Sequence, residues 1–297
     1  MIFAIKPFEI HDGDGIRTTV FFKGCSLRCQ WCHNPESWSL KAEPAFDGAH
    51  CRDCGKCAAV CAAGAHQIKN GTHIFIRDLC ENCGKCMTVC PAEALTLYGD
   101  ERSPEEIAEE VLSDELFMKE SGGGVTFSGG EPLLQADFCR ALALIIKSHG
   151  VHLAIDTCGN VPREAFENIL DLADVFLYDL KAIDEETHKK CTGASNRLIL
   201  ENLRYLDTVG KPIEIRYPYV PGMNDGEVTA IGEFVKTLSS VTRLRVLGYH
   251  DFARSKYASL GLPYPLPDTP VPSKDEIGKV IASLVSMGVP ACGSNDL

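Results

Sequence analysis

Two near-identical cysteine runs constrain this chain more than any other feature. Residues 51–61 read CRDCGKCAAVC, and residues 80–90, 29 positions later, read CENCGKCMTVC. A repeat of this kind has to be recognised before a fold is assigned, because each copy builds one structural unit. The repeated segment is short in large apolar side chains, so bound metal must supply much of its folding free energy. We therefore expect residues 47–99 to form a small inserted domain, with residues 1–46 and 100–297 forming the main one.

The number of cysteines, fifteen in 297 residues, is high, and eleven of them stand in three tight clusters. The N-terminal segment MIFAIKPFEIHDGDG lacks the basic and long apolar regions of a secretory signal. Disulfides are rare in a reducing compartment, where clustered cysteines usually bind metal. We therefore expect a cytoplasmic metal protein, with disulfides as the disfavoured alternative. Cys139, Cys158, Cys191 and Cys292 lie outside the clusters and are expected to be structural.

Charge and hydropathy argue against nucleic acid and a membrane as partners. The formal net charge of −12 disfavours nucleic acid, whose phosphates favour a basic surface. The chain contains no run of 18 apolar residues, so no membrane-spanning helix is expected. Hydrophobic residues make up 45% of the chain, which is enough for a sizeable core.

Outside the cysteine-rich segment, apolar runs alternate with amphipathic helical patterns, as in an α/β protein built from βα units. Ser103 with Glu106 and Ser273 with Glu276 have the spacing of helix N-caps, and Gly288 follows the second helix. Six units are too few for a closed eight-stranded barrel, so we expect a partial, open (β/α)6 barrel. A doubly wound open sheet is the alternative. The expected strands are Thr18–Phe22, Val125–Ser128, His152–Asp156, Val175–Asp179, Ile213–Tyr217 and Leu244–Gly248.

Glycine-rich, polar and charged residues follow these strands at their carboxyl ends. In both candidate folds the carboxyl ends of parallel strands share one edge, where active sites form. The sequence therefore predicts a single site at that edge. The residues concerned are Gly24 and Cys25, Ser128 to Pro132, Asp156 and Thr157, Asp179 to Lys181, Arg216, and Gly248 to His250.

The third cysteine cluster, Cys25, Cys29 and Cys32, has only three members. A closed iron–sulfur or zinc site uses four protein ligands, so three ligands leave one metal corner open for chemistry. We interpret the spacing as one 4Fe–4S cluster with a free iron. A zinc site that takes His33 as its fourth ligand is the alternative.

The three-cysteine spacing resembles that of the radical S-adenosylmethionine (SAM) superfamily, in which SAM binds the fourth iron. The stretch FSGGEP at 127–132 is similar to the superfamily's Gly-Gly-Glu-Pro element, although by itself it would also fit a tight turn. The stretches HDGDGIRTTVFFKGC, WCHNPESW, SGGGVTFSGGEPLLQ, DTCGN, DLK and IRYPYVPGMND resemble the glycyl-radical-enzyme activating enzymes. This family includes the pyruvate formate-lyase activase and has a subfamily with a cysteine-rich insert.

The resemblance implies an oxidoreductase that reductively cleaves SAM to a 5′-deoxyadenosyl radical. The radical would then abstract an α-hydrogen from a glycine in a partner glycyl radical enzyme, with flavodoxin or ferredoxin as electron donor. Two alternatives remain open. One is a radical SAM enzyme that acts on a small molecule or another peptide. The other is a non-enzymatic iron–sulfur electron carrier, which would have no need of an open iron.

The resemblance also implies roles for single residues. Asp12 would hold the partner's glycine loop, and the family's proline is replaced by Asp14 in this motif. Asp156 and Thr157, with Asp179, match a monovalent-cation site, and a turn or helix-cap pair is the alternative. The implied catalytic residues are Cys25, Cys29, Cys32, Lys181, Arg216 and His250. The implied SAM contacts are Trp31, Cys32, His33, Gly129, Gly130, Glu131, Asp179, Leu180, Lys181 and His250.

Each run of the insert has the spacing of bacterial ferredoxins, in which the fourth cysteine of a run serves the other cluster. We therefore expect a ferredoxin-like α+β insert with two more 4Fe–4S clusters, which makes three in the chain. The sequence leaves open whether the insert relays electrons, docks the partner or stabilises the protein. The expected ligand sets are Cys51, Cys54, Cys57 and Cys90 for one cluster, and Cys80, Cys83, Cys86 and Cys61 for the other.

Overall fold

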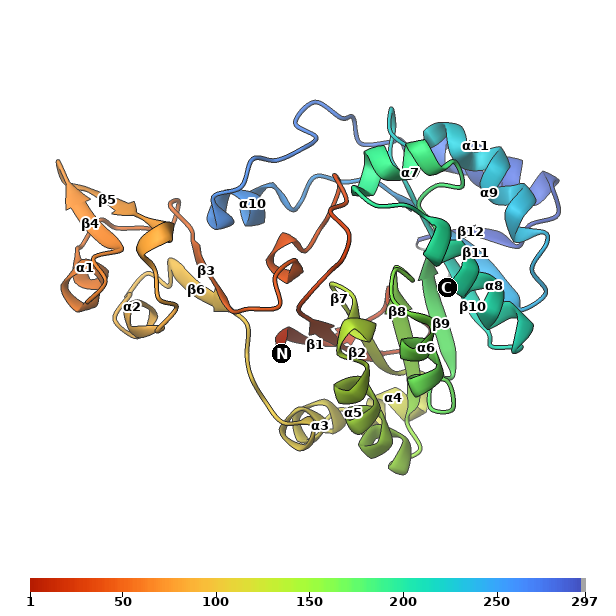
Figure 1. Ribbon diagram of the computed structural model, residues 1–297, viewed down its shortest axis with the longest axis horizontal. Helices are drawn as coiled ribbons and strands as arrows, with labels where there is room; N and C mark the ends of the chain where they lie inside the picture. The colour runs from red at the N-terminus through yellow and green to blue at the C-terminus, as the bar shows by residue number, and fades with distance from the viewer. Residues whose placement is uncertain (295–297) are drawn as a thin grey trace.

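An eight-stranded sheet forms the centre of the computed structural model, which describes residues 1–294 (Figure 1). The strand order is β1-β2-β7-β8-β9-β10-β11-β12, and within the described residues the two edge strands do not pair with each other, so the sheet is open. The strands are β1 (Ile2–Glu9), β2 (Arg17–Phe22), β7 (Gly124–Gly129), β8 (His152–Thr157), β9 (Val175–Asp179), β10 (Ile213–Tyr219), β11 (Val241–Gly248) and β12 (Ala291–Gly293).

All six expected strands are present, from β2 and β7 through β11, and each pairs in parallel with the next. Two further strands were not expected. β1 pairs antiparallel with β2, and β12 adds a seventh parallel strand beside β11. Neither has the signal of a buried parallel strand, because β1 is an edge strand with several exposed residues and β12 has only three residues.

The helices of the main domain pack on this sheet, with α5 against β8 and α11 against β11. Both expected N-caps are present. Ser103 Oγ accepts from the Glu106 N–H at 3.2 Å, and the Glu106 carboxylate accepts from the Ser103 N–H at 2.8 Å. Ser273 Oγ accepts from the Glu276 N–H at 3.2 Å. The helices are α3 (Pro104–Leu112), α4 (Glu115–Ser121), α5 (Ala136–Ser148), α6 (Arg163–Ile169), α7 (Glu185–Thr192), α8 (Arg197–Thr208), α9 (Val228–Val235), α10 (Arg254–Leu260) and α11 (Lys274–Ser286), with short 3₁₀ turns η1 (Pro35–Ser37), η3 (Pro132–Gln135) and η4 (Asp225–Glu227).

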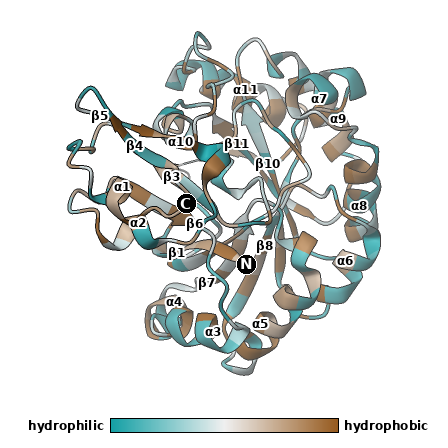
Figure 2. Cartoon of the chain, turned by 60° about the vertical axis from the view of Figure 1, so that its left-hand side comes forward, coloured by the Kyte–Doolittle hydropathy of each residue, from teal (hydrophilic) through white to brown (hydrophobic). Residues whose placement is uncertain are grey.

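The core lies between the sheet and these helices. Val20, Phe22, Phe127, Ile155 and Phe176 are fully buried on neighbouring strands. Figure 2 shows apolar residues along the strands and more polar residues on the outer helices. No helix within residues 1–294 combines the length and apolarity needed to cross a membrane.

The cysteine-rich segment projects to one side of the main sheet, in orange and yellow at the left of Figure 1. It contains two small antiparallel sheets, β3–β6 and β4–β5. Arg77 ties it to the main domain, because its guanidinium donates to the carbonyl oxygens of Pro44 and Ser259, the latter in α10. The elements are β3 (Glu43–Phe46), α1 (Lys56–Val60), β4 (His66–Lys69), β5 (Thr72–Phe75), η2 (Arg77–Leu79), α2 (Lys85–Thr88) and β6 (Leu95–Tyr98).

Candidate active site at the carboxyl ends of the strands

A cavity of about 270 Å³ lies at the carboxyl ends of the parallel strands. Cys25, Cys29 and Cys32, from the loop after β2, form part of its lining. The shared edge that the sequence predicted is therefore one continuous site. The other expected residues in the lining are Asp12, Trp31, His33, Ser128, Gly129, Gly130, Asp156, Asp179, Lys181, Arg216, Gly248 and Tyr249.

The glycine loop after β7 lies directly against the cysteine loop. The Gly130 N–H donates to the Phe22 carbonyl oxygen at 2.9 Å, and the Glu131 N–H donates to the Gly24 carbonyl oxygen at 2.7 Å. A Cβ atom on Gly130 would lie 2.2 Å from that same Gly24 oxygen, so only glycine fits there. The tight turn that FSGGEP suggested by itself thus also brings bare backbone to the cavity.

Glu131 lies behind the cavity lining and is fully buried. Its carboxylate accepts from Thr157 Oγ1 at 2.9 Å, from the Cys158 N–H at 2.8 Å and from the Leu133 N–H at 3.1 Å. Burial raises the pKa of this carboxyl group, and the hydrogen bonds oppose that shift. In the structure the Glu131 carboxylate holds the loop and lies outside the cavity lining, where the resemblance implied a SAM contact.

Three other residues to which the resemblance assigned roles also lie outside the lining. The Thr157 hydroxyl donates to the Glu131 carboxylate, and the buried Leu180 donates its N–H to the Arg216 carbonyl oxygen at 2.9 Å. His250 stacks its ring on His33 with 3.9 Å between centroids, so it borders the cavity through His33.

Burial changes the acidity of two of the three thiols. It raises the pKa of Cys29 and raises that of Cys32 to about 11. The pKa of Cys25 is lowered, because a hydrogen bond with Cys158 outweighs the effect of burial. Cysteine binds metal as the thiolate, so iron would have to displace the protons. Three soft sulfur donors around one cavity fit a 4Fe–4S cluster.

The spacing of the sulfur atoms argues against zinc. A tetrahedral zinc ion brings its ligand atoms to within about 4 Å of one another. Among residues 1–294, the one set of three or more ligand atoms that gathers within 4.8 Å is Cys57, His66 and His73. The zinc alternative with His33 as the fourth ligand therefore finds no support. The Nε2 atom of His33 lies 3.3 Å from the carbonyl oxygen of His250 instead.

Two buried cations and three carboxylates also line the cavity. Arg216 lies 3.4 Å from Asp12 and 3.2 Å from Asp156, and Lys181 lies 2.7 Å from Asp179. Burial raises the pKa of Asp156 to about 7, although Arg216 opposes the shift. Burial lowers the pKa of Arg216, but the surrounding carboxylates outweigh burial, so the pKa lies above its ordinary value. Such a site can hold a ligand that carries both charges, or a small cation.

Tyr249 was among the strand-end residues expected from the sequence, whereas Asn224 was missed. Tyr249 lines the cavity, and it packs with Trp31 in a small apolar cluster. Asn224 is buried, and its amide joins the Val220 N–H to the Lys181 carbonyl oxygen, each at 2.8 Å. Asn224 lies inside the marked stretch IRYPYVPGMND, but its partner Lys181 is 43 residues away in the chain.

The cysteine-rich segment contains two further cavities, each lined by four cysteines. The first is lined by Cys51, Cys54, Cys57 and Cys90, and the second by Cys61, Cys80, Cys83 and Cys86. These are the two sets of four named from the sequence.

Comparison with known proteins decides the family. The model of the radical SAM superfamily matches residues 19–235. The chain belongs to this superfamily. Two solved proteins share its fold at low identity. A radical SAM methyltransferase from Sphaerobacter thermophilus has a TM-score of 0.54 at 13% identity, covering 97% of this chain and 76% of that one. Streptococcus suis SuiB bound to precursor peptide SuiA has a TM-score of 0.56 at 12% identity, covering 93% and 47%.

Curated relatives narrow the family to activating enzymes. The trans-4-hydroxy-L-proline dehydratase activating enzyme of Clostridioides difficile is 41% identical over 286 residues, covering 94% of each chain. The choline trimethylamine-lyase activating enzyme of Oleidesulfovibrio alaskensis is 38% identical, covering 96% of this chain and 94% of the relative. The benzylsuccinate synthase activating enzyme of Thauera aromatica is 41% identical, covering 88% and 82%. This radical SAM enzyme is therefore an oxidoreductase of the glycyl-radical-enzyme activating group. The relatives favour this activity over the two alternatives, a radical SAM enzyme with another substrate and a non-enzymatic electron carrier.

Proposed function

We propose that the cavity at the strand ends is where this activating enzyme cleaves SAM and meets the glycine loop of its partner. The observation that carries the proposal is the juxtaposition of three cysteines, a bare glycine backbone and buried charges around one cavity. Cys25, Cys29 and Cys32 would hold a 4Fe–4S cluster. When bound, the reduced cluster supplies the electron that splits SAM into methionine and a 5′-deoxyadenosyl radical.

The protein contributes binding, orientation and exclusion of water around that chemistry. Gly129 and Gly130 expose backbone that can approach the methionyl group closely. Lys181 and Asp179 offer one charge of each sign to a zwitterionic ligand. Asp12 lies beside Arg216, where it can receive a peptide loop. Asp156 and Asp179 remain as oxygen ligands for a monovalent cation, because the Thr157 hydroxyl is engaged by Glu131.

We also propose that the cysteine-rich segment holds two 4Fe–4S clusters, one for each four-cysteine cavity. Backbone N–H groups point at their sulfur atoms, as is common around iron–sulfur clusters. Ala65 donates to Cys61 Sγ at 3.2 Å and Asp53 donates to Cys51 Sγ at 3.4 Å. Neither set of four sulfurs gathers tightly enough, among the described residues, for a single metal ion.

The two insert sites differ in their position relative to the main domain. A cavity of about 370 Å³ lies at the junction of the insert and the main domain, and Cys80 lines it together with Arg28 and Trp38. The site of Cys61, Cys80, Cys83 and Cys86 is therefore proximal to the catalytic loop, and the site of Cys51, Cys54, Cys57 and Cys90 is distal. We infer a relay in which flavodoxin or ferredoxin reduces the insert and the proximal cluster passes electrons to the catalytic one.

The activity is tested by incubating the reduced, iron-loaded protein with SAM and a candidate glycyl radical enzyme. The partners of the named relatives form the first panel: hydroxyproline dehydratase, choline trimethylamine-lyase and benzylsuccinate synthase. We expect 5′-deoxyadenosine together with a glycyl radical signal in electron paramagnetic resonance (EPR) for one of them. Product formation without a glycyl radical on any protein of this kind would contradict the partner assignment.

The relay is tested with Cys54→Ala and Cys83→Ala, one variant in each insert site. Glycyl radical yield should fall with flavodoxin or ferredoxin as donor and persist with a small chemical reductant that reaches the catalytic site directly. Equal yields with both donors would exclude an obligatory relay.

A further inference from the structure

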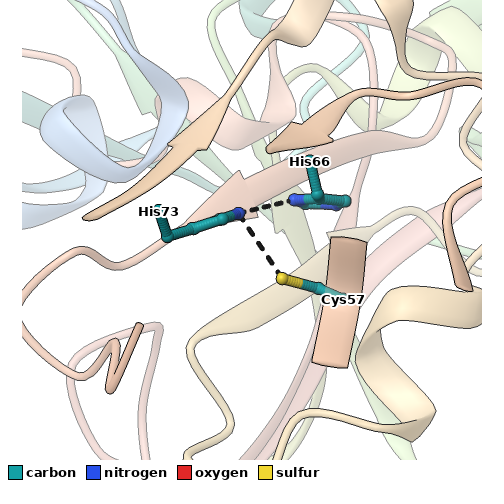
Figure 3. Close-up of side chains that lie close together, drawn as sticks. All are labelled: Cys57, His66 and His73. Carbon is teal, nitrogen blue, oxygen red and sulfur yellow. Dashed lines mark hydrogen bonds between the residues drawn. The ribbon is translucent and has the colours of Figure 1, made fainter. Parts of the chain in front are cut away.

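His66 and His73 form a buried pair in the insert, on the facing strands β4 and β5 (Figure 3). The exposed fractions of the two residues are only 4% and 7%. His66 Nδ1 lies 2.9 Å from His73 Nε2, which is a hydrogen-bond distance. The neighbouring aromatic rings fix both histidines, because His66 stacks on Phe75 and His73 meets the edge of Phe46.

Both ring nitrogens of His73 face sulfur atoms of the distal set. Nε2 lies 3.5 Å from Cys57 Sγ, and Nδ1 lies 3.8 Å from Cys51 Sγ. A histidine ring always carries at least one N–H, so His73 can donate to a thiolate of this set. The main chain holds the residue in place, because its own N–H donates to Asp53 Oδ1 at 2.7 Å.

The pair spans the two insert sites. His73 lines the cavity of the distal cysteines, and His66 lines the cavity of the proximal ones. Among the described residues, the ring hydrogen bond of His66 goes to His73 and to no cysteine. The hydrogen-bond contacts between these two histidine rings and cysteine sulfur are therefore confined to the distal site.

The internal repeat makes this asymmetry informative. Adding 29 to the residue numbers of β3 gives those of β5, and adding 29 to those of β4 gives those of β6. The two cysteine sites should therefore be near copies of each other. Under that offset His73 corresponds to Pro44, which lines the proximal cavity, and His66 corresponds to Leu95, which lines the distal one. Proline offers no side-chain donor. The proximal site therefore lacks the donor that the distal site has.

We propose that His73 is a positioning residue that donates its ring N–H to a thiolate of the distal cluster and gives that cluster a higher reduction potential than its repeat counterpart. A reduced cluster carries more negative charge, and N–H groups directed at its sulfurs stabilise that form. His66 orients the His73 ring. An electron delivered to the insert therefore settles first on the distal cluster. The inference rests on the proposed function, because it requires clusters in both insert sites.

The test is an anaerobic redox titration of the fully loaded protein, followed by EPR, with iron and zinc measured in the same samples. His73→Phe keeps the ring and removes the donor, His73→Gln restores an N–H near the Nε2 position, and His66→Phe removes the orienting bond. His149→Phe, a half-exposed histidine of the main domain, is the control. We expect one midpoint to fall in His73→Phe, a smaller fall in His73→Gln and His66→Phe, and no change in the control. The other two midpoints serve as internal references.

The outcomes separate the two claims. About twelve irons per chain with unchanged midpoints in His73→Phe would overturn the role of His73 and leave the clusters standing. A shift of both insert midpoints by the same amount would overturn the asymmetry. Zinc at one per chain with only about eight irons would mean that Cys57, His66 and His73 hold a zinc ion. That result would overturn the proposed distal cluster itself.

Discussion

Replacing Arg216 by methionine should destabilise the protein strongly, and the loss should depend on pH. The guanidinium lies 3.2 Å from Asp156 and 3.4 Å from Asp12, and the side chains of all three residues are less than a fifth exposed. At an effective dielectric constant near 20, each contact is worth about 5 kcal/mol of Coulomb energy. Much of that gain offsets desolvation, and removing one partner of a buried pair costs about 3–5 kcal/mol. We expect a loss of that size in the free energy of unfolding at pH 8.5.

The pH dependence follows from Asp156. Burial raises its folded pKa to about 7, so its titration favours the folded protein at low pH, and that contribution is lost as pH rises toward 7. At pH 5 the Asp156 carboxyl is protonated in the folded protein. Removing Arg216 therefore leaves only Asp12 as an unpaired charge at pH 5, but both Asp12 and Asp156 at pH 8.5. Arg216→Met should therefore cost less at pH 5 than at pH 8.5, by roughly 1–3 kcal/mol.

Anaerobic urea unfolding, followed by far-ultraviolet circular dichroism, measures both values. Arg163→Met is the matched control, because Arg163 is exposed and lies over the ring of Tyr205, so it should cost less than about 1 kcal/mol. Adding Asp156→Asn to Arg216→Met should recover part of the loss by removing the unpaired carboxylate. Equal losses at both pH values, with no recovery in the double variant, would refute the reasoning.

Three further predictions concern the loop, the insert and a helix cap. Glu131→Gln puts an amide NH₂ group against the buried backbone N–H of Leu133 or Cys158. The variant should lose about 1.5–3 kcal/mol of unfolding free energy in urea and bind SAM more weakly without losing iron. Unchanged stability would mean that the carboxylate does not hold the loop. Removing iron with a chelator should unfold the insert first, seen as proteolytic cleavage between residues 43 and 98, and cleavage starting in the main domain would contradict this. Ser103→Ala should cost about 1 kcal/mol in urea unfolding by deleting the cap of α3, and a loss below about 0.3 kcal/mol would show that the cap is dispensable.

The sequence predicted the six central strands because parallel strands buried on both faces appear as continuous apolar runs. It also placed the site, since the carboxyl ends of these strands fall on one edge. It could not predict β1, whose half-exposed residues resemble a loop, or β12, which is only three residues long. Short edge strands depend on pairing with a sheet that already exists.

Within the site, cysteine and glycine spacing was informative because those residues act through local geometry. The role of Glu131 was not predictable, because its hydrogen-bond partner Thr157 comes 26 residues later and on a neighbouring strand. The pairing of His66 with His73 was missed for a similar reason. A histidine seven residues from another gains meaning only when a hairpin brings their rings together beside Cys57.

The central claim is that the cluster of Cys25, Cys29 and Cys32 keeps one iron for SAM. The most direct test is EPR of the reduced, iron-loaded protein before and after addition of SAM, with product analysis of the same sample. We predict that SAM changes the signal of one cluster and yields 5′-deoxyadenosine and methionine, and that Cys29→Ala abolishes both while the insert signals persist. An identical spectrum with and without bound SAM, and no 5′-deoxyadenosine from a protein with all its iron reduced, would contradict the account.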